Sequence, residues 1–377
     1  MKISWFTENY PPNRGGMSRS CDRIIANLRK HHTVDIYHFT NKFEPFFSEA
    51  NIGGLYTAIP MYEDSSHSLN LLWAFIKDNA EIAQSDVFVG FGSHLCIKGI
   101  PLMATWLKKP LLSCFRGNDF DTAIFSQKKQ SLLFAIENSN AIACVSREKV
   151  ERIKRLNLNR NVFYTPNSID ASQWEVLKSD RELAGKLKKD LALKNTTVIG
   201  IIGFLKQKKG VDFFISCLKK SRLASNVHLR IVGEIEPHLE TLLIQKDIAY
   251  TICVPGAHTQ LTANYLLCDA VAIPSIYDGM PNVIFEAAIL NIPIIASNAG
   301  GIPDILDETN AFVFKVLSEA SLIETLDEYA STPSEKRLEK SFFLKEKVLS
   351  EFSPEIETKN YLDIFKNITH QIKIVQS

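Results

Sequence analysis

The chain has 377 residues, which exceeds one average domain and leads us to expect two. Hydrophobic residues make up 45% and charged residues 23%, a composition typical of soluble globular proteins with enough apolar surface for two cores. The formal net charge is only +1, so the overall charge gives no support for a nucleic-acid partner.

The cysteines and the start of the chain bear on its location in the cell. Seven cysteines are dispersed singly, with no C-x-x-C pair, which indicates free thiols in a reducing compartment. The apolar stretch at residues 3–6 is too short for a signal peptide, and no run approaches the ~20 apolar residues that a membrane-spanning helix needs. We therefore expect a cytoplasmic protein.

The charge is distributed unevenly between the two halves. Residues 1–166 carry 20 basic and 15 acidic side chains, whereas residues 167–377 carry 23 and 27. A basic first half suits a domain that faces anionic lipid or an acidic acceptor. The alternative is that the difference is ordinary scatter in surface charge.

Short β-rich apolar runs alternate with helical patterns through the first half. A strand at 2–6 is followed by a helix at 18–29, whose apolar residues share one face. Ser146 is a natural N-cap for a second helix, 147–156, which is basic on its expected polar side and carries Lys149 there. The further strands of this half are expected at 34–38, 86–90, 111–115, 141–145 and 162–164.

The same alternation restarts at residue 197, after a segment rich in Lys, Asp and Glu (169–195) that we interpret as an interdomain connection. Strands are expected at 197–204, 228–232, 251–254, 270–274 and 294–296, and helices at 211–218, 283–290 and 355–374. This alternation predicts parallel β-α-β units in two α/β domains. Open parallel sheets bind ligands beyond the carboxyl ends of their strands, so the loops after strands should hold the site.

The stretch 274–288 carries the clearest candidate site. A strand ends at Pro274, a turn with Asp278 and Gly279 follows, and the next helix carries Glu286 one turn inside it. Amides at a helix start can receive a diphosphate, and a glycine lets the backbone approach it closely. Glu286 lies among apolar residues, where an unpaired carboxylate is costly, so it needs partners such as the hydroxyls of a ribose. A bond to a neighbouring backbone or basic group is the alternative.

A basic loop follows the strand 197–204. It contains Lys206, Lys208 and Lys209 between two glycines, which makes it a candidate clamp for a diphosphate. An exposed lysine-rich turn without a ligand is the alternative.

Two loops in the first half also follow strands. Gly15 and Gly16 lie between the first strand and a helix, where paired glycines bring backbone amides close to a phosphate or a sugar. Residues 115–119 follow another strand and carry Arg116 and Asp119, for which a local ion pair is the alternative to a ligand contact.

In their order along the chain, these stretches resemble the retaining glycosyltransferases of family 4, which have the GT-B fold. The segment 278–286 resembles the family's acid–x7–Glu motif, with Asp278 in place of the usual Glu. Residues 291–304 resemble the strand and Gly-Gly-Ile-Pro loop that follow it. In that family the first acid lies near the donor sugar and the last Glu holds the ribose.

Two further stretches match the family and depart from it at one position each. The basic loop resembles Gly-Arg-Leu-x-x-x-Lys-Gly, where Lys209 matches the Lys that neutralises the phosphates and Phe204 stands at the Arg position. Residues 115–119 resemble His-Gly-x-Asp, where Asp119 matches the Asp and Arg116 replaces a His that lies close to the donor sugar. An arginine stays charged and cannot act as a general base, although it can bind a phosphate or an acidic sugar.

The resemblance implies an α/β fold of two Rossmann-like domains facing a cleft. It implies an acceptor-binding domain at 1–168, the connection at 169–195, a nucleotide-sugar-binding domain at 196–353 and a helix at 354–377 that crosses back to the first domain.

The function that the resemblance implies is retaining, metal-independent transfer of a sugar from a UDP- or GDP-linked donor, with no other cofactor. We expect a saccharide or lipid-linked acceptor, in cell-surface polysaccharide or glycoconjugate synthesis, contacted by residues 43–68. For a lipid-linked acceptor, peripheral contact with the inner membrane face is the hypothesis.

The site residues expected from the motifs and the resemblance fall into three groups. The catalytic candidates are Asp278, Arg116 and Asp119; the donor-binding candidates are Gly15, Gly16, Lys206, Lys209, Gly279, Met280, Pro281, Asn282, Val283 and Glu286; and His94, Gly203, Glu234 and His258 are further candidates in loops after strands.

Two other classes of protein were weighed. A Rossmann-type dehydrogenase would need Gly-x-Gly-x-x-Gly after a strand, and the sequence has none. A catalytically inactive GT-B scaffold or partner subunit, which binds nucleotide sugar without turnover, is favoured by the replacements at Phe204 and Arg116. Turnover of any donor distinguishes the scaffold from the enzyme.

Overall fold

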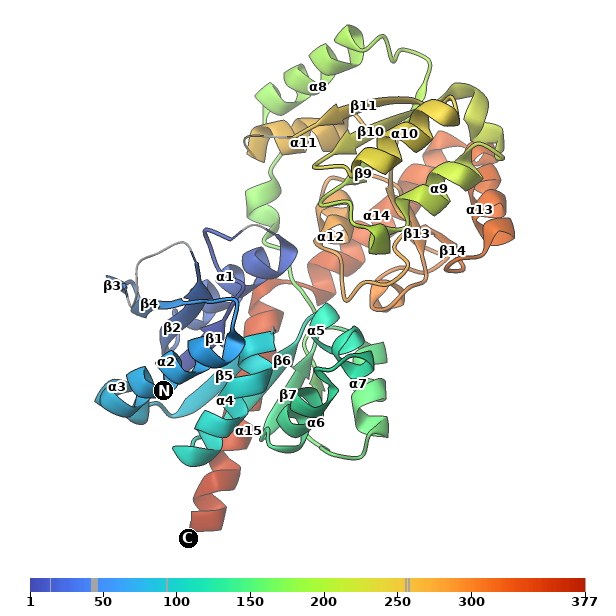
Figure 1. The fold of residues 1–377 in the computed structure, drawn as a ribbon. Helices are drawn as coiled ribbons and strands as arrows, with labels where there is room; N and C mark the ends of the chain where they lie inside the picture. The colour runs from blue at the N-terminus through green and yellow to red at the C-terminus, as the bar shows by residue number, and fades with distance from the viewer. Residues whose placement is uncertain (14, 42–46, 93, 255, 257, 377) are drawn as a thin grey trace. The chain divides into compact units, whose positions relative to one another are not determined.

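The computed structural model describes residues 1–376 except 14, 42–46, 93, 255 and 257, and it describes only the backbone of 118, 258, 259 and 370–376. The chain divides into two compact units (Figure 1). Unit 1 comprises Met1–Asn167 and Pro354–Ser377, and unit 2 comprises Ser168–Ser353. Each unit is built around its own sheet and is described by itself.

The sheet of unit 1 has the strand order β3-β4-β2-β1-β5-β6-β7-β8, and all its neighbouring strands are parallel except β3 and β4. The strands are β1 (Lys2–Thr7), β2 (Thr33–Thr40), β3 (Ser48–Asn51), β4 (Gly54–Pro60), β5 (Val87–Phe91), β6 (Leu111–Phe115), β7 (Ala141–Cys144) and β8 (Val162–Tyr164). The chain runs outward from β1 to β2 and then returns to the other side of β1 as β5. The order therefore reverses between β1 and β5, which makes this the switch point where ligands of open parallel sheets bind.

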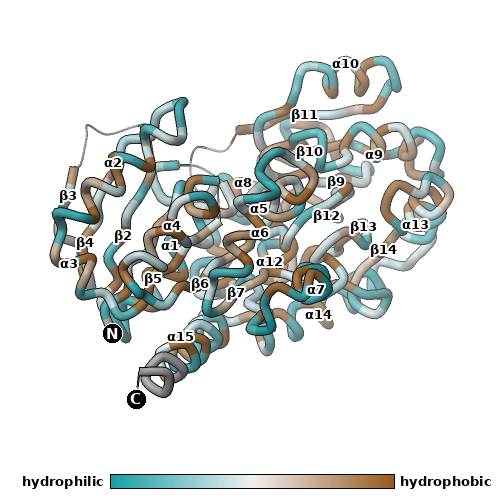
Figure 2. The backbone as a smooth tube through the Cα atoms, turned by 60° about the horizontal axis from the view of Figure 1, so that its bottom comes forward, coloured by the Kyte–Doolittle hydropathy of each residue, from teal (hydrophilic) through white to brown (hydrophobic). Residues whose placement is uncertain are grey.

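Helices cover both faces of this sheet. They are α1 (Gly16–Leu28), α2 (Ser65–Asp78), α3 (Ala80–Ala83), α4 (His94–Trp106), α5 (Asn118–Asp121), α6 (Lys129–Glu137), α7 (Arg147–Arg155) and α15 (Pro354–Gln376). The core on one face joins α1 and α15 to the sheet, with Trp5 and Tyr361 fully buried in it. The core on the other face joins α2 and α4, with Phe6 and Phe88 in contact at 5.1 Å between ring centroids. Figure 2 shows hydrophilic and hydrophobic residues mixed along α15, as expected for a helix with one buried face.

Unit 2 has a six-stranded, fully parallel sheet in the order β11-β10-β9-β12-β13-β14. Its strands are β9 (Thr197–Ile202), β10 (Val227–Val232), β11 (Ala249–Cys253), β12 (Ala270–Ile273), β13 (Ile294–Ser297) and β14 (Phe312–Phe314). Its helices are α8 (Lys178–Asp190), α9 (Val211–Leu218), α10 (Pro237–Gln245), α11 (His258–Leu266), α12 (Asn282–Ile289), α13 (Glu319–Ser331) and α14 (Ser334–Glu351). The switch point lies between β9 and β12, so the loops after these two strands are neighbours.

Local sequence explains several element boundaries. The Ser146 hydroxyl accepts a hydrogen bond from the Lys149 amide, as expected for the N-cap of α7. The α9 helix spans the residues that its apolar periodicity predicts. Gly210 precedes it at φ +62°, a left-handed conformation that suits glycine.

The segment interpreted as an interdomain connection contains α8, which packs on α11 within unit 2. The residues 43–68, expected to contact the acceptor, contain β3, β4 and the start of α2, and residues 43–46 among them lie outside the described part of the chain. Among the residues that the structure describes, no helix is both long and apolar enough to cross a bilayer.

Candidate functional site

The loops that follow β9 and β12 meet at the switch point of unit 2. The amide of Ile276 donates a hydrogen bond of 2.8 Å to the carbonyl oxygen of Lys208, which joins the two loops through the backbone. A Cβ atom at Gly210 would lie 2.3 Å from the carbonyl oxygen of Pro274, so only a glycine lets the basic loop approach the end of β12 this closely. The predicted diphosphate loop and the predicted acidic turn therefore lie together and form one candidate site.

An ion pair joins these loops through their side chains. The Nζ atom of Lys209 lies 2.5 Å from Oδ2 of Asp278, and the two side chains are 24% and 13% exposed. Burial by itself would raise the pKa of Asp278, but the positive charges of Lys209 and then Lys208 outweigh it and hold this pKa below its usual value. Asp278 is therefore a carboxylate at neutral pH, and Lys209 is its cation.

The loop after β13 supports the same turn from the other side. The amide of Gly301 donates to the carbonyl oxygen of Asp278 at 3.1 Å. Gly300 adopts φ +57°, and a Cβ atom there would lie 1.9 Å from that carbonyl oxygen. The Gly-Gly-Ile-Pro segment thus fixes the backbone of Asp278, which explains why a glycine stands at position 300.

The remaining donor-binding candidates of unit 2 continue directly from this turn. Gly279, Met280 and Pro281 are buried, and Pro281 is the N-cap of α12, which begins at Asn282. The start of a helix attracts anions because its first amides point outward and its dipole is positive there. Val283 follows in the first turn and lines a small hollow together with Lys209 and Ser275.

Glu286 is buried in α12 with a partner that the sequence did not reveal. The hydroxyl of Tyr265, in α11, donates to Oε2 of Glu286 at 2.5 Å, and the ring of Trp174 packs edge-on against Tyr265. Glu286 is only 4% exposed and Tyr265 is fully buried. Tyr265 lies 21 positions before Glu286 within an ordinary helical pattern, so no local signal pointed to this contact.

Two lysines that follow Phe204 in the basic loop, Lys206 and Lys208, contact the rings of different aromatic residues. Phe204 is 56% exposed, and Nζ of Lys206 lies 4.9 Å from its ring centroid. Nζ of Lys208 lies 5.4 Å from the ring of Tyr277. Lys206 therefore places a positive charge against the side chain that occupies the family's Arg position, held by a cation–π contact.

Three of the further candidates, Gly203, Glu234 and His258, follow neighbouring strands of unit 2. Gly203 and Gly233 approach so closely that a Cβ atom at Gly233 would lie 2.0 Å from the carbonyl oxygen of Gly203. Glu234 follows as an exposed residue. His258 begins α11, but its side chain lies outside the described part of the structure.

The candidates of unit 1 gather at the switch point between β1 and β5. Gly15 adopts φ +131° as the N-cap of α1, and Gly16 begins that helix. His94 begins α4, after β5. Burial and the nearby charges of Lys128 and Lys98 lower the pKa of His94, which keeps its imidazole neutral at pH 7.

Arg116 occupies a buried position in unit 1 with several partners from the protein itself. Its guanidinium donates to the carbonyl oxygen of Thr165 at 2.8 Å and to Oδ1 of Asn167, and it lies 3.7 Å from Oε1 of Glu357 in α15. Arg23 completes the cluster with two hydrogen bonds to the same carboxylate, of 2.9 and 3.0 Å. Arg116 therefore links the end of the segment Met1–Asn167 to α15. Contact with a sugar stays a prediction.

Asp119 shapes its own loop. Its carboxylate accepts from the amides of Arg116, Gly117 and Phe120 at 2.7–2.9 Å. A Cβ atom at Gly92 would lie 2.8 Å from its Oδ2 atom, so the loop after β5 packs against it. A local ion pair between the side chains of Arg116 and Asp119 was the alternative to a ligand contact. In the structure, the Asp119 carboxylate instead accepts a hydrogen bond from the backbone amide of Arg116.

The basic helix α7 departs from the expected pattern at one position. Lys149, predicted on the polar side, is 2% exposed, with Nζ 2.5 Å from Oδ2 of Asp121. Arg152 bonds the other oxygen of that carboxylate at 2.9 Å. The prediction of a solvent-facing Lys149 is wrong, because Asp121, the last residue of α5, gives its charge a largely buried partner.

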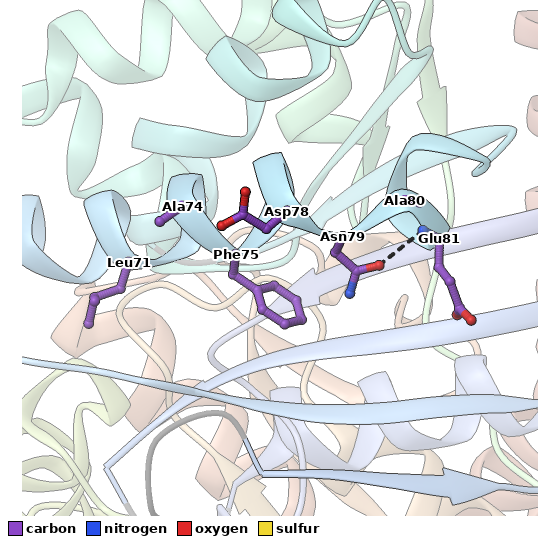
Figure 3. Close-up of a pocket in the computed structure, with 7 residues that line it drawn as sticks. All are labelled: Leu71, Ala74, Phe75, Asp78, Asn79, Ala80 and Glu81. Carbon is purple, nitrogen blue, oxygen red and sulfur yellow. Dashed lines mark hydrogen bonds between the residues drawn. The ribbon is translucent and has the colours of Figure 1, made fainter.

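A second hollow, of about 400 Å³, lies in unit 1 away from both switch points. Figure 3 shows its lining residues from α2 and α3, where Oδ1 of Asn79 accepts from the amide of Glu81. The hollow contains Asp78 and Glu81 and none of the predicted site residues.

Comparisons with known proteins agree with the motifs. Residues 196–331 match the family model of glycosyl transferases group 1. An uncharacterized glycosyltransferase of Methanocaldococcus jannaschii is 24% identical over 339 residues, covering 81% of this chain and 83% of its own. The GDP-mannose-dependent alpha-(1-6)-phosphatidylinositol monomannoside mannosyltransferase of Mycolicibacterium smegmatis is 21% identical, with 79% and 81% covered.

A solved structure extends the likeness to the whole fold. Anabaena HepE, in complex with UDP and glucose, superposes with a TM-score of 0.75 at 15% identity, covering 97% of this chain and all of the other. The expected α/β fold of GT-B type is confirmed, as is the resemblance to glycosyl transferases group 1.

Proposed function

We propose that this chain, in which residues 196–331 match the glycosyl transferases group 1, transfers a sugar from a nucleotide-sugar donor with retention of the anomeric configuration. The observation that carries the proposal is the meeting of Lys209, Asp278 and the start of α12 at the switch point of unit 2, with Glu286 in the same helix. A cation, an anion-binding helix start and a buried carboxylate are the groups that a diphosphate and a ribose require.

Each of these groups has a definite task in the proposed reaction. Lys209 and the amides of α12 bind the diphosphate and stabilise the negative charge that develops on the leaving group. Glu286, held by Tyr265, accepts hydrogen bonds from the ribose hydroxyls. Asp278 lies at the donor sugar. We assign no nucleophile, because same-side attack after front-face departure of the leaving group requires none.

The charge of the departing diphosphate is balanced in this proposal by protein groups, without a metal ion or another cofactor. UDP- and GDP-linked donors are both proposed, since HepE was solved with UDP and the mycobacterial relative is GDP-mannose-dependent. That relative acts on a phosphatidylinositol monomannoside, which supports a saccharide or lipid-linked acceptor and a role in surface glycoconjugate synthesis. A cytoplasmic enzyme with peripheral membrane contact would meet such an acceptor.

Thermal shift with a panel of nucleotides and nucleotide sugars tests the donor site. A ligand at 100 times its dissociation constant adds roughly 2.7 kcal/mol of stability if it binds only the folded state. We expect a shift with one nucleotide family that Glu286→Gln abolishes and that the exposed Glu335→Gln, on α14, leaves intact. No shift with any nucleotide would contradict the proposed site.

Turnover of the bound donor, with and without EDTA, tests the chemistry. We expect transfer to a saccharide or lipid-linked acceptor that EDTA leaves unchanged, with the anomeric configuration of the donor sugar kept in the product. Binding without turnover of any donor would instead support the inactive scaffold, which the replacements at Phe204 and Arg116 favour.

A further inference from the structure

Lys209 is the cation that a donor diphosphate needs, and in the structure it is already paired with Asp278. Nζ of Lys209 lies 2.5 Å from Oδ2 of Asp278, which is within direct contact of the two charged groups. A lysine ammonium is a compact point charge, so phosphate oxygens that bind it must share it with this carboxylate or displace the carboxylate. Phosphate oxygens brought beside Asp278 are also repelled by its negative charge.

The backbone on both sides of the pair is held in place. The amide of Lys209 donates to the carbonyl oxygen of Lys206 at 2.8 Å, and the carbonyl oxygen of Asp278 accepts from Gly301 at 3.1 Å. Gly210 and Gly300 permit approaches to neighbouring carbonyl oxygens that no Cβ atom would allow. A ligand that competes for Lys209 therefore acts on the side chains, and the loops keep their place.

The two ligands of the proposed reaction differ in what they offer Asp278. A free nucleoside diphosphate takes Lys209 and leaves Asp278, at 13% exposure, without its ion-pair partner and beside new negative charge. A nucleotide sugar also brings sugar hydroxyls, which can donate hydrogen bonds to the carboxylate in exchange. Hydrogen bonds to a charged group are worth more than those between neutral groups, so the exchange offsets the lost ion pair.

We propose that Asp278 is a specificity-determining residue that selects nucleoside diphosphates carrying a sugar over the free nucleoside diphosphate. It pairs with Lys209 when no donor is bound, and it releases Lys209 at low cost only to a ligand whose hydroxyls replace the ammonium. In this way Asp278 favours the substrate and weakens retention of the product after transfer. The inference rests on the proposed function, because it takes the site to be the donor site.

Isothermal titration with UDP, GDP and their sugar conjugates tests this role in the full chain. Asp278→Asn keeps the shape of the side chain and removes its charge, so we expect it to bind the free diphosphate at least threefold more tightly than the wild type and the nucleotide sugar less tightly. Asp307→Asn is the matched control, because Asp307 pairs with Lys347 at 3.6 Å elsewhere in unit 2. It should leave both affinities unchanged.

The outcomes separate this inference from the proposed function. If Asp278→Asn binds the free diphosphate no more tightly than the wild type does, Asp278 does not compete for Lys209 and the inference is overturned while the donor site stands. If neither ligand binds the wild type, the proposed function and the inference both fall. Asp278→Ser, measured in the same way, replaces the Asn variant should that variant not fold, with the same expected direction.

Discussion

Replacing Tyr265 with phenylalanine removes the hydroxyl that holds the buried carboxylate of Glu286 and leaves the ring in place. The hydrogen bond is 2.5 Å long, and its acceptor is 4% exposed. A hydrogen bond to a charged group contributes about 1.5–3 kcal/mol, so the free energy of unfolding of unit 2 should fall by about that amount. For a unit of this size the loss corresponds to a decrease in Tm of about 3–12 °C.

Tyr329→Phe is the matched control for this measurement. The hydroxyl of Tyr329 donates at 3.0 Å to the carbonyl oxygen of Asp269, which is a neutral acceptor in the same unit. Its removal should cost only about 0.5–1.5 kcal/mol. Urea denaturation followed by tryptophan fluorescence compares the two variants. Equal losses would refute the argument that the acceptor of Tyr265 is charged and strongly bound.

A nucleotide-binding measurement tests whether Tyr265 positions Glu286 for the ribose or only stabilises the fold. If Glu286 holds the ribose, the wild type should bind a ribonucleoside diphosphate more tightly than its 2′-deoxy analogue. Tyr265→Phe should reduce that ratio, because a carboxylate that has lost this hydrogen bond is positioned less firmly and selects the hydroxyls less well. An unchanged ratio at reduced stability would limit Tyr265 to a packing role.

Three further predictions follow from single residues. Gly300→Ala should destabilise unit 2 by more than about 1 kcal/mol in urea denaturation, because the φ of +57° and the 1.9 Å approach of a carbonyl oxygen exclude a Cβ atom at this position. Gly185→Ala, on α8, is the control and should not destabilise the unit, because a Cβ atom there meets no atom within 4 Å. Arg116→Met should lower the free energy of unfolding of unit 1 by about 3–5 kcal/mol, because it removes one of the two guanidinium groups around the buried Glu357; a loss below about 1 kcal/mol would contradict this role. The lowered pKa of His94 means that the unfolded chain takes up a proton first as the pH falls below about 6.5, so the stability of unit 1 should decrease between pH 7 and pH 5, and His94→Asn should reduce that slope.

The sequence predicted five of the six strands of unit 2, all but β14 (Phe312–Phe314), and it placed the candidate site in the loops after strands, because both depend on local patterns. Short apolar runs marked β9 and β12, and the residues after them carried the charges and glycines. Since parallel strands end at one edge, the neighbouring positions of Lys209 and Asp278 followed from their places after strands. The structure adds that the two side chains bond each other directly, which spacing could not specify.

Contacts between distant parts of the chain were beyond local patterns. Tyr265 reaches Glu286 from another helix, and Arg116 bonds α15 across 241 residues of sequence, to Glu357. The amphipathic pattern of α7 placed Lys149 on the polar side, yet the carboxylate of Asp121, at the end of α5, draws it into the interior. In each case the partner decides the environment of the side chain, and the partner belongs to a different element.

The phenylalanine at position 204, where the family has an arginine, allows a test that distinguishes an active glycosyltransferase from an inactive scaffold. Nζ of Lys206 lies 4.9 Å from the centroid of the Phe204 ring, so a positive charge lies beside the side chain that occupies the family's Arg position. Lys206→Met should therefore weaken binding of a nucleoside diphosphate about tenfold, or ~1.4 kcal/mol. Adding Phe204→Arg to that variant should restore the affinity, because the guanidinium then supplies the lost charge from the neighbouring position. If Lys206→Met leaves the affinity unchanged, phosphate binding does not depend on Lys206, and the replacement at Phe204 is an uncompensated loss of charge that favours the scaffold.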